Sequence, residues 1–165
     1  MQHGDLSMRF IWATATHQGR VREANEDSLF PTSDGDSDET VTLIVADGMG
    51  GHVAGEVASR LAVNAAASSE LEPGDRVAAG NRAIREEVGR QPNLEGMGTT
   101  MTLVELHPDA IAHFAHVGDS RAYLLRNDEL SQVTEDHTVL AEYVAAGKLT
   151  EEEAADHDAE CRLEE

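Results

Sequence analysis

The sequence predicts a single domain that mixes helices and strands. Strand-like apolar runs come first, two helix-like segments follow, and further strand-like runs come after them. This strand-strand, helix-helix, strand-strand order is typical of a mixed α/β fold. The length of 165 residues is enough for one sizeable hydrophobic core and short for two full domains.

The N-terminal strands are predicted from β-branched and aromatic residues. Strands are expected at 10–16, around Leu29 and at 41–46. The acidic segment 32–40 is interpreted as the connection between the last two. An EF-hand there is excluded by spacing, because Glu39 stands where that calcium loop needs glycine.

Helices are predicted from small-residue runs, apolar stripes and capping patterns. A mostly buried helix is expected over 54–68, and an amphipathic helix over 75–90. Thr134, followed by acidic residues, has the form of an N-cap for a helix over 139–146. Thr150 with its three glutamates resembles a capping box for one more short helix.

The C-terminal half supplies four more expected strands. They are predicted at 99–106, 110–117, 122–125 and 129–133, and Asn127-Asp128 forms the turn between the last two.

Composition excludes several classes of function. The net charge of −20 and the pI near 4.5 argue against non-specific nucleic-acid binding, which requires basic residues at the phosphates. No apolar window reaches membrane-span length, and Met1 to Arg9 lacks the regions of a signal peptide. We therefore expect a monomeric cytoplasmic protein. The single Cys161 excludes an internal disulfide and is interpreted as an incidental thiol.

The central stretch of the sequence is Val45 to His52, in which an apolar run ends at Asp47 and three glycines follow within four residues. A carboxylate at a strand end is rigidly held, and neighbouring glycines allow the backbone to approach a metal or ligand closely. The same pattern is equally compatible with a plain surface turn.

Two other motifs are weak by themselves. Gly118-Asp119-Ser120 is not a serine-hydrolase elbow, because Ala122 stands where that motif requires glycine. His113 and His116 fall on opposite faces of one strand, so we interpret them as core or cross-strand residues rather than ligands of a shared metal.

Acidic residues recur at three strand ends: Glu26 with Asp27, then Asp47, then Asp119. Oxygen ligands without cysteine or paired histidines favour magnesium or manganese over zinc or copper. Two such ions about 3.5–4 Å apart can orient a nucleophile for attack on phosphorus. Arg22 could bind phosphate oxygens through its bidentate guanidinium group.

Five motifs in order resemble the bacterial branch of the metal-dependent protein phosphatases, known as the PPM or type 2C family. The resemblance covers about Phe10 to Glu153 and rests on the following residues: Gly19-x-Val21-Arg22-x-x-Asn25-Glu26-Asp27, Val45-Ala46-Asp47-Gly48-Met49-Gly50-Gly51-His52-x-x-Gly55-Glu56-x-Ala58-Ser59, Gly98-Thr99-Thr100, His116-Val117-Gly118-Asp119-Ser120-Arg121-x-Tyr123 and Thr134-x-Asp136-His137.

The resemblance implies a site with two Mn²⁺ or Mg²⁺ ions. Asp47 would bridge them, and the Gly48 carbonyl would complete the coordination of one. Glu26 and Asp27 match an acidic pair that acts as direct or water-mediated ligands. Asp119 matches the carboxylate that holds a third, weaker metal.

The implied activity is hydrolysis of phosphoserine and phosphothreonine in proteins that a serine/threonine kinase has phosphorylated. Arg22 would bind the substrate phosphate, a metal-bound hydroxide would be the nucleophile, and Arg22, Glu26 and Asp47 would form the catalytic set. Met49 stands where eukaryotic members often carry a histidine proposed as general acid, and His52 is not assigned that role.

The implied fold is a four-layer sandwich of two mainly antiparallel β-sheets flanked by α-helices. The expected domain is 8–165, with a tail at 1–7. The family's Ser-Asp-Gly and Asp-Asn blocks, which carry two more metal-binding aspartates, do not occur, so we expect a C-terminally truncated domain. The alternative hypothesis is therefore a catalytically impaired module that binds a phosphoprotein or a single metal without turnover.

Overall fold

The computed structural model describes residues 8–50, 53–150 and 152–154. The chain divides into two compact units, Met1–Ser120 and Arg121–Glu165.

The first unit is organised around an antiparallel sheet in the order β2-β4-β6-β7. Its strands are β2 (Asp27–Phe30), β4 (Val41–Met49), β6 (Met101–Leu106) and β7 (Ala112–Val117), and the short β5 (Gly98–Thr99) also pairs with β4. β4 is the longest described strand, and its first six residues, Val41 to Ala46, are apolar except for Thr42. Beyond Asp47, Gly48 and Met49 of β4 still pair with β5.

A separate two-stranded sheet pairs β1 (Phe10–Trp12) with β3 (Gly35–Ser37). The predicted strand at 10–16 is therefore too long. The backbone N–H of Thr14 bonds to the Asp34 carboxylate at 2.7 Å, which takes it out of any strand ladder. The acidic connection at 32–40 contains β3, which the sequence did not predict.

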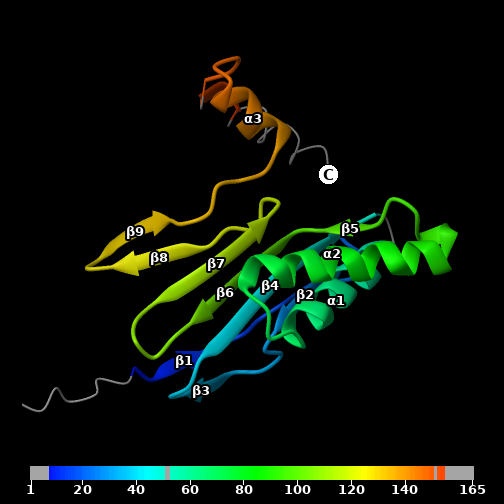
Figure 1. The fold of residues 1–165 in the computed structure, drawn as a ribbon. Coiled ribbons are helices and arrows are strands. Elements are labelled where there is room, and N and C mark those ends of the chain that lie inside the picture. The colour runs from blue at the N-terminus through cyan, green and yellow to red at the C-terminus, as the bar shows by residue number, and fades with distance from the viewer. Residues whose placement is uncertain (1–7, 51–52, 151, 155–165) are drawn as a thin grey trace, which may run out of the picture. The chain divides into compact units, whose positions relative to one another are not determined.

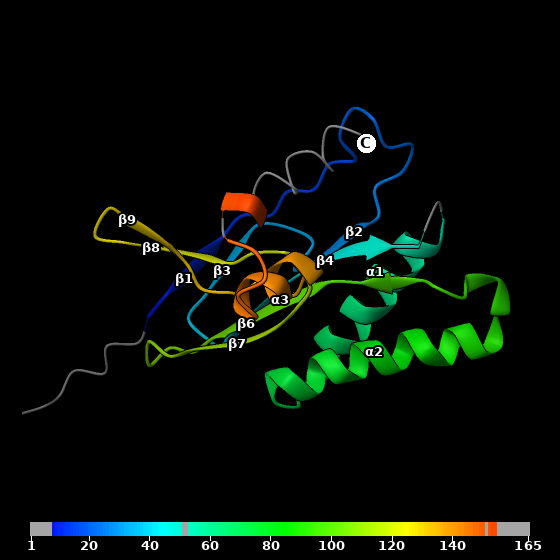
Figure 2. The same ribbon diagram turned by 90° about the horizontal axis from the view of Figure 1, so that it is seen from above.

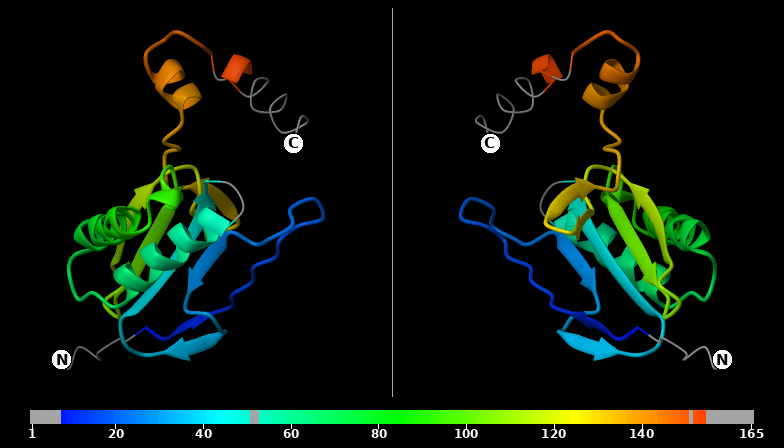
Figure 3. Two further views of the ribbon diagram at one scale, coloured as in Figure 1. Left: turned by 90° about the vertical axis from the view of Figure 1, so that its right-hand side faces the viewer. Right: turned by 90° about the vertical axis from the view of Figure 1, so that its left-hand side faces the viewer.

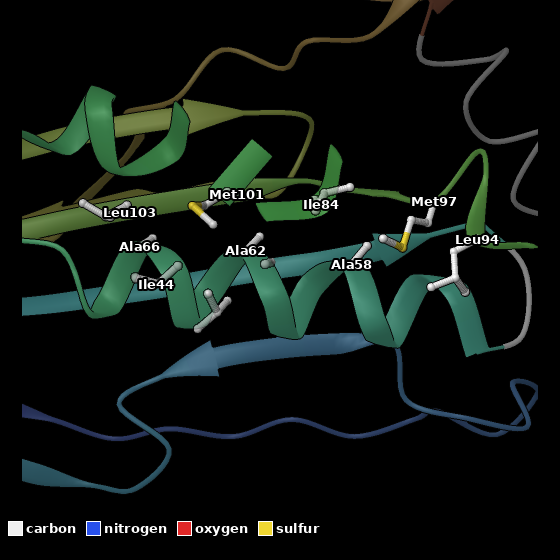
Figure 4. Close-up of a cluster of buried hydrophobic side chains, with 11 residues drawn as sticks. Ile44, Ala58, Ala62, Ala66, Ile84, Leu94, Met97, Met101 and Leu103 are labelled. Carbon is white, nitrogen blue, oxygen red and sulfur yellow. The ribbon is translucent and has the colours of Figure 1, made fainter. Parts of the chain in front are cut away.

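Two long helices cover one face of the main sheet, α1 (Val53–Ala67) and α2 (Pro73–Arg90), as Figures 1 and 2 show. Apolar residues along α1 face the strands. A short 3₁₀ turn, η1 (Pro92–Leu94), follows α2 and contributes Leu94 to the core. Figure 4 shows the core cluster, whose buried members are Ile44, Ala46, Ala58, Ala62, Val63, Ala66, Ile84, Leu94, Met97, Met101 and Leu103.

The alternation of β4 decides which side chains reach the core. Ile44, Ala46 and Gly48 are buried under the helices, whereas Val45 and Asp47 are exposed on the opposite face. The acidic side chain that the sequence singles out therefore lies on the face of the sheet away from α1.

The second unit contains a hairpin of β8 (Tyr123–Arg126) and β9 (Glu129–Gln132), followed by α3 (Val139–Ala145). The predicted turn at Asn127 and Asp128 is confirmed, since both residues have positive φ, as a two-residue hairpin turn of this type requires. The Arg121 guanidinium forms bidentate bonds to Asp136, with a shortest distance of 2.6 Å.

The capping predictions for this unit have different outcomes. Thr134 is not the N-cap of α3: its hydroxyl accepts the backbone N–H of Ala122 at 3.0 Å, and Thr138 caps the helix by accepting the N–H of Ala141 at 3.1 Å. The capping box at Thr150 is confirmed through reciprocal bonds with Glu153 at 2.8 and 3.2 Å.

The predicted mixture of helices with antiparallel sheets is confirmed. Among the described residues, no helix is long and apolar enough to cross a membrane. The cytoplasmic location, the monomeric state and the domain bounds of 8–165 stay predictions, and Cys161 lies outside the described residues.

Candidate active site

The site begins with two facing carboxylates. Asp27, the first residue of β2, lies directly opposite Asp47 of β4 in the antiparallel register. Directly opposed residues of an antiparallel pair project from the same face of a sheet. The pairing of the strands therefore brings together two acids that are 20 positions apart (47 − 27).

The electrostatics of this pair centre on Asp47. Partial burial of its carboxyl group is the largest cause that raises its pKa above the ordinary value. The charge and hydrogen bond of Asp27 and the charge of Asp119 raise the pKa further, whereas Arg22 lowers it. Two carboxylates and one arginine that the sequence singled out therefore act on the carboxyl group of Asp47.

Arg22 lies on the long loop between β1 and β2. Figure 3 shows this loop in blue. The Asn25 side chain anchors this loop: its amide nitrogen donates to Thr16 Oγ1 at 2.7 Å, and its oxygen accepts the Asp27 N–H at 3.1 Å. This explains why asparagine precedes the acidic pair in the first motif, since a side-chain amide both donates and accepts.

Glu26 points to the other side of β2. A Cβ placed on Gly55 of α1 would lie 2.9 Å from its carboxyl carbon, so the Glu26 side chain packs against the first turns of that helix. The backbone carbonyl of Glu26 accepts bonds from Gly48 N–H at 3.2 Å and from Ser59 Oγ at 2.6 Å. Glu26 is not among the charged groups that shift the pKa of Asp47.

The glycines of the second motif permit close packing. A Cβ on Gly48 would lie 2.6 Å from the Glu26 carbonyl oxygen and still closer to the Gly55 carbonyl. Both glycines are therefore needed for α1, β2 and β4 to meet. His52 lies outside the described residues.

Asp119 is presented by a turn after β7. Gly118 has φ of +101°, and a Cβ there would lie 2.5 Å from Thr100 Cγ2. Three residues without a predicted role hydrogen-bond here. Thr99 and Thr100 bond to the Asp47 backbone, and Ser120 bonds to the Thr100 hydroxyl group. Their only sequence signal was membership of the quoted motifs.

A cavity of about 190 Å³ lies beside the facing carboxylates. Asp27, Asp47 and Ser120 contribute to its lining. A larger cavity of about 450 Å³ adjoins it and shares Thr16 and Asp27 with it, and Arg60 of α1 also contributes to its lining. A small anion or water molecules therefore have room next to the two acids.

The donor set fits a divalent cation. Asp27 and Asp47 offer paired carboxylate oxygens, and Mg²⁺ or Mn²⁺ would neutralise the negative charges that repel each other there. No group of three or more His, Cys, Asp or Glu side chains within the described residues is already close enough to hold a metal. The fit therefore rests on the facing pair, with Asp119 nearby.

Comparison with known proteins is consistent with this chemistry. The family described as Protein phosphatase 2C matches residues 14–142. The chain belongs to the protein phosphatase 2C family. The predicted resemblance is confirmed.

Relatives within the protein phosphatase 2C family cover most of this chain. The serine/threonine protein phosphatase PstP of Mycobacterium tuberculosis is 43% identical over an alignment of 155 residues, and the match covers 88% of this chain and 29% of PstP. The serine/threonine phosphatase stp of Listeria welshimeri is 37% identical over 157 residues, covering 86% of this chain and 60% of stp.

A solved phosphatase structure has a similar fold. The catalytic domain of PstP in complex with two manganese ions is 39% identical and superposes with a TM-score of 0.66. The match covers 89% of this chain and 62% of that domain. This chain thus spans less than two thirds of the length of these relatives, and the metal-ligand and phosphate-binding assignments stay predictions.

Proposed function

We propose that this protein is a metal-dependent phosphatase that hydrolyses phosphoserine and phosphothreonine in proteins phosphorylated by a serine/threonine kinase. The observation that carries the proposal is the facing pair Asp27 and Asp47, in which Asp119 and Arg22 also act on Asp47. Relatives that bear the name serine/threonine protein phosphatase support the substrate class.

The chain's own residues would bind metal and substrate. Asp27 and Asp47 would hold Mn²⁺ or Mg²⁺, with the Gly48 carbonyl completing the shell, and Asp119 would hold a third ion. Glu26, whose side chain packs against Gly55, would contribute only through water. When bound, the ions would activate a water molecule as nucleophile and neutralise negative charge at phosphorus.

Arg22 would bind the non-bridging oxygens of the substrate phosphate. Its charge already acts on Asp47, so its guanidinium group belongs to the same small region of charge. A bidentate guanidinium supplies both orientation and charge at a phosphate. It also provides a fixed positive group in a protein whose net charge is −20.

The test measures hydrolysis of para-nitrophenyl phosphate and of a phosphothreonine peptide with Mn²⁺. Wild type, Asp47→Asn and the control Asp75→Asn, which alters a surface carboxylate of α2, are compared. We expect activity in wild type and the control, and a loss of at least about 10³-fold in Asp47→Asn. Equal rates in all three proteins, or activity that survives a chelator, would refute the proposal.

A second candidate is a module that binds one metal or a phosphoprotein without turnover. It is favoured by the absence of a three-ligand cluster within the described residues. Calorimetric titration with Mn²⁺ separates the two candidates: one site without hydrolysis supports the module, whereas two sites with hydrolysis support the enzyme.

A further inference from the structure

An unusual hydrogen-bonding pattern holds the backbone of Asp47. β4 keeps a single register with β5 and β6, in which Gly48 lies opposite Thr99, so Thr100 lies opposite Asp47. At this position the Thr100 N–H donates to the Asp47 carbonyl at 2.9 Å, as in an ordinary ladder. The Asp47 N–H instead donates to the Thr100 hydroxyl, at 2.9 Å.

The carbonyl that would ordinarily accept this bond has another partner. Thr99 Oγ1 lies 2.9 Å from the Thr100 carbonyl oxygen and 2.8 Å from the Asp47 carbonyl oxygen, so these two acceptors share its single proton. A side-chain oxygen thus replaces a main-chain oxygen at the one position of the ladder that carries the central carboxylate.

Thr100 also contacts both sequence neighbours of Asp119, Gly118 and Ser120. Thr100 Oγ1 lies 2.6 Å from Ser120 Oγ, and the methyl group of Thr100 occupies the space that a Cβ on Gly118 would need. Thr100 is 3% exposed, so these contacts are shielded from water. One side chain therefore joins two acids that are 72 positions apart (119 − 47).

We propose that Thr100 is a positioning residue that sets, through its hydroxyl group, where the Asp47 carboxylate lies relative to Asp119. The inference rests on the proposed function, because it makes Thr100 a support of the metal ligands. The Asp47 carboxyl group is repelled by Asp27 and Asp119 and would move apart from them if its backbone were loose. Residues that orient ligands in this way affect metal affinity without touching the metal.

Two substitutions separate the hydroxyl group from the methyl group. Thr100→Val keeps the shape and leaves the Asp47 N–H without an acceptor, whereas Thr100→Ser keeps the acceptor and removes the methyl group. Thr134→Val is a matched control, because the 8% exposed Thr134 also accepts a backbone N–H, that of Ala122, at 3.0 Å.

The experiment is a Mn²⁺ titration followed by electron paramagnetic resonance of the free ion. We expect Thr100→Val to weaken Mn²⁺ binding about tenfold, and Thr100→Ser to stay within about threefold of wild type. Thr134→Val is expected to bind as wild type does. If Thr100→Val does not fold, Thr100→Ala removes the same hydroxyl group without placing a second methyl beside the Asp47 N–H.

A measurement without metal distinguishes failure of this inference from failure of the proposed function. Amide hydrogen exchange at Asp47 is followed by NMR, and we expect faster exchange in Thr100→Val than in Thr100→Ser. Wild-type protein that binds no Mn²⁺ would contradict the proposed metal site, and the exchange comparison would still decide the role of Thr100. Equal Asp47 exchange in both variants would overturn the inference, as would equal Mn²⁺ affinity in both when wild type binds the ion.

Discussion

Asp27 and Asp47 lie directly opposite each other on β2 and β4, and the charge of Asp27 raises the pKa of Asp47. Two like charges on directly opposed residues oppose folding unless a proton or a cation lies between them. In the metal-free protein the two carboxylates therefore repel each other at the place where a divalent cation would bind.

Asp47→Asn should stabilise the metal-free protein at neutral pH. The pKa of Asp47 is raised in the folded state, so protonation of its carboxyl group stabilises the fold. This stabilisation is fully present below the unfolded pKa of about 3.9, and it is lost as the pH rises through the folded pKa. Asparagine does not ionise, so the variant should be more stable than wild type at neutral pH, by a margin that solvent screening keeps small. Urea unfolding with a chelator, at several values between about pH 4 and 7, measures this.

The control for that measurement is Asp75→Asn, at an exposed carboxylate. The difference between Asp47→Asn and wild type should grow with pH, and the control should show no such growth. Parallel pH curves for Asp47→Asn and wild type would contradict the raised pKa.

Arg22→Ala should raise the pKa of Asp47 further, because Arg22 is the group that lowers it. NMR titration of the Asp47 side-chain carbon in metal-free protein measures this shift, with Arg20→Ala as control from the same loop. If Arg22 also binds substrate phosphate, kcat/KM should fall about 10- to 100-fold, equivalent to about 1.5–3 kcal/mol. An unchanged Asp47 titration would show that the two side chains do not interact.

Gly48→Ala should destabilise the first unit strongly. The added methyl group would lie 2.6 Å from the Glu26 carbonyl oxygen and would also overlap the Gly55 carbonyl, so backbone must move. We expect a loss of at least about 2 kcal/mol in the free energy of unfolding, measured by urea denaturation. Gly89→Ala in α2 meets no atom within 4 Å and should gain about 0.5–1 kcal/mol. A similar change in both variants would refute the packing argument.

The sequence was sufficient to predict the acidic residues but not their contacts. Asp47 and Asp119 could be recognised because each follows or borders an apolar run next to glycine. That Asp27 faces Asp47 depends on the strand register, which is set across the connection that contains β3. Glu26 adjoins Asp27 in sequence, yet strand alternation places its side chain against Gly55.

Threonines show why local patterns alone were insufficient. Thr134 and Thr138 both precede α3, and only tertiary structure reveals that the Thr134 hydroxyl accepts the Ala122 N–H. The proposed role of Thr100 depends on its hydroxyl group, which accepts the Asp47 N–H in place of a backbone carbonyl. Residue type alone does not reveal such a replacement. Such side-chain-to-backbone bonds become visible only once the strands are paired.

Arg76→Met should destabilise the protein although Arg76 is remote from the facing acids in sequence. Arg76 is 4% exposed on α2, and its guanidinium donates to the Ala66 carbonyl at 2.8 Å and to Glu105 at 2.8 Å. Methionine fills similar volume but leaves both acceptors without this donor. Because Glu105 keeps a bond of 2.8 Å to His107, we expect a moderate loss of about 2–3 kcal/mol.

Urea unfolding of Arg76→Met is to be compared with that of Arg82→Met, which alters an exposed arginine of the same helix. The control should stay within about 0.5 kcal/mol of wild type, because exposed substitutions away from special contacts have small effects. Equal unfolding midpoints for the two variants would mean that the Arg76 bonds to Ala66 and Glu105 contribute no net stability. A loss confined to Arg76→Met would show that this buried ion pair fastens α2 to β6, and so supports the sheet on which Asp47 lies.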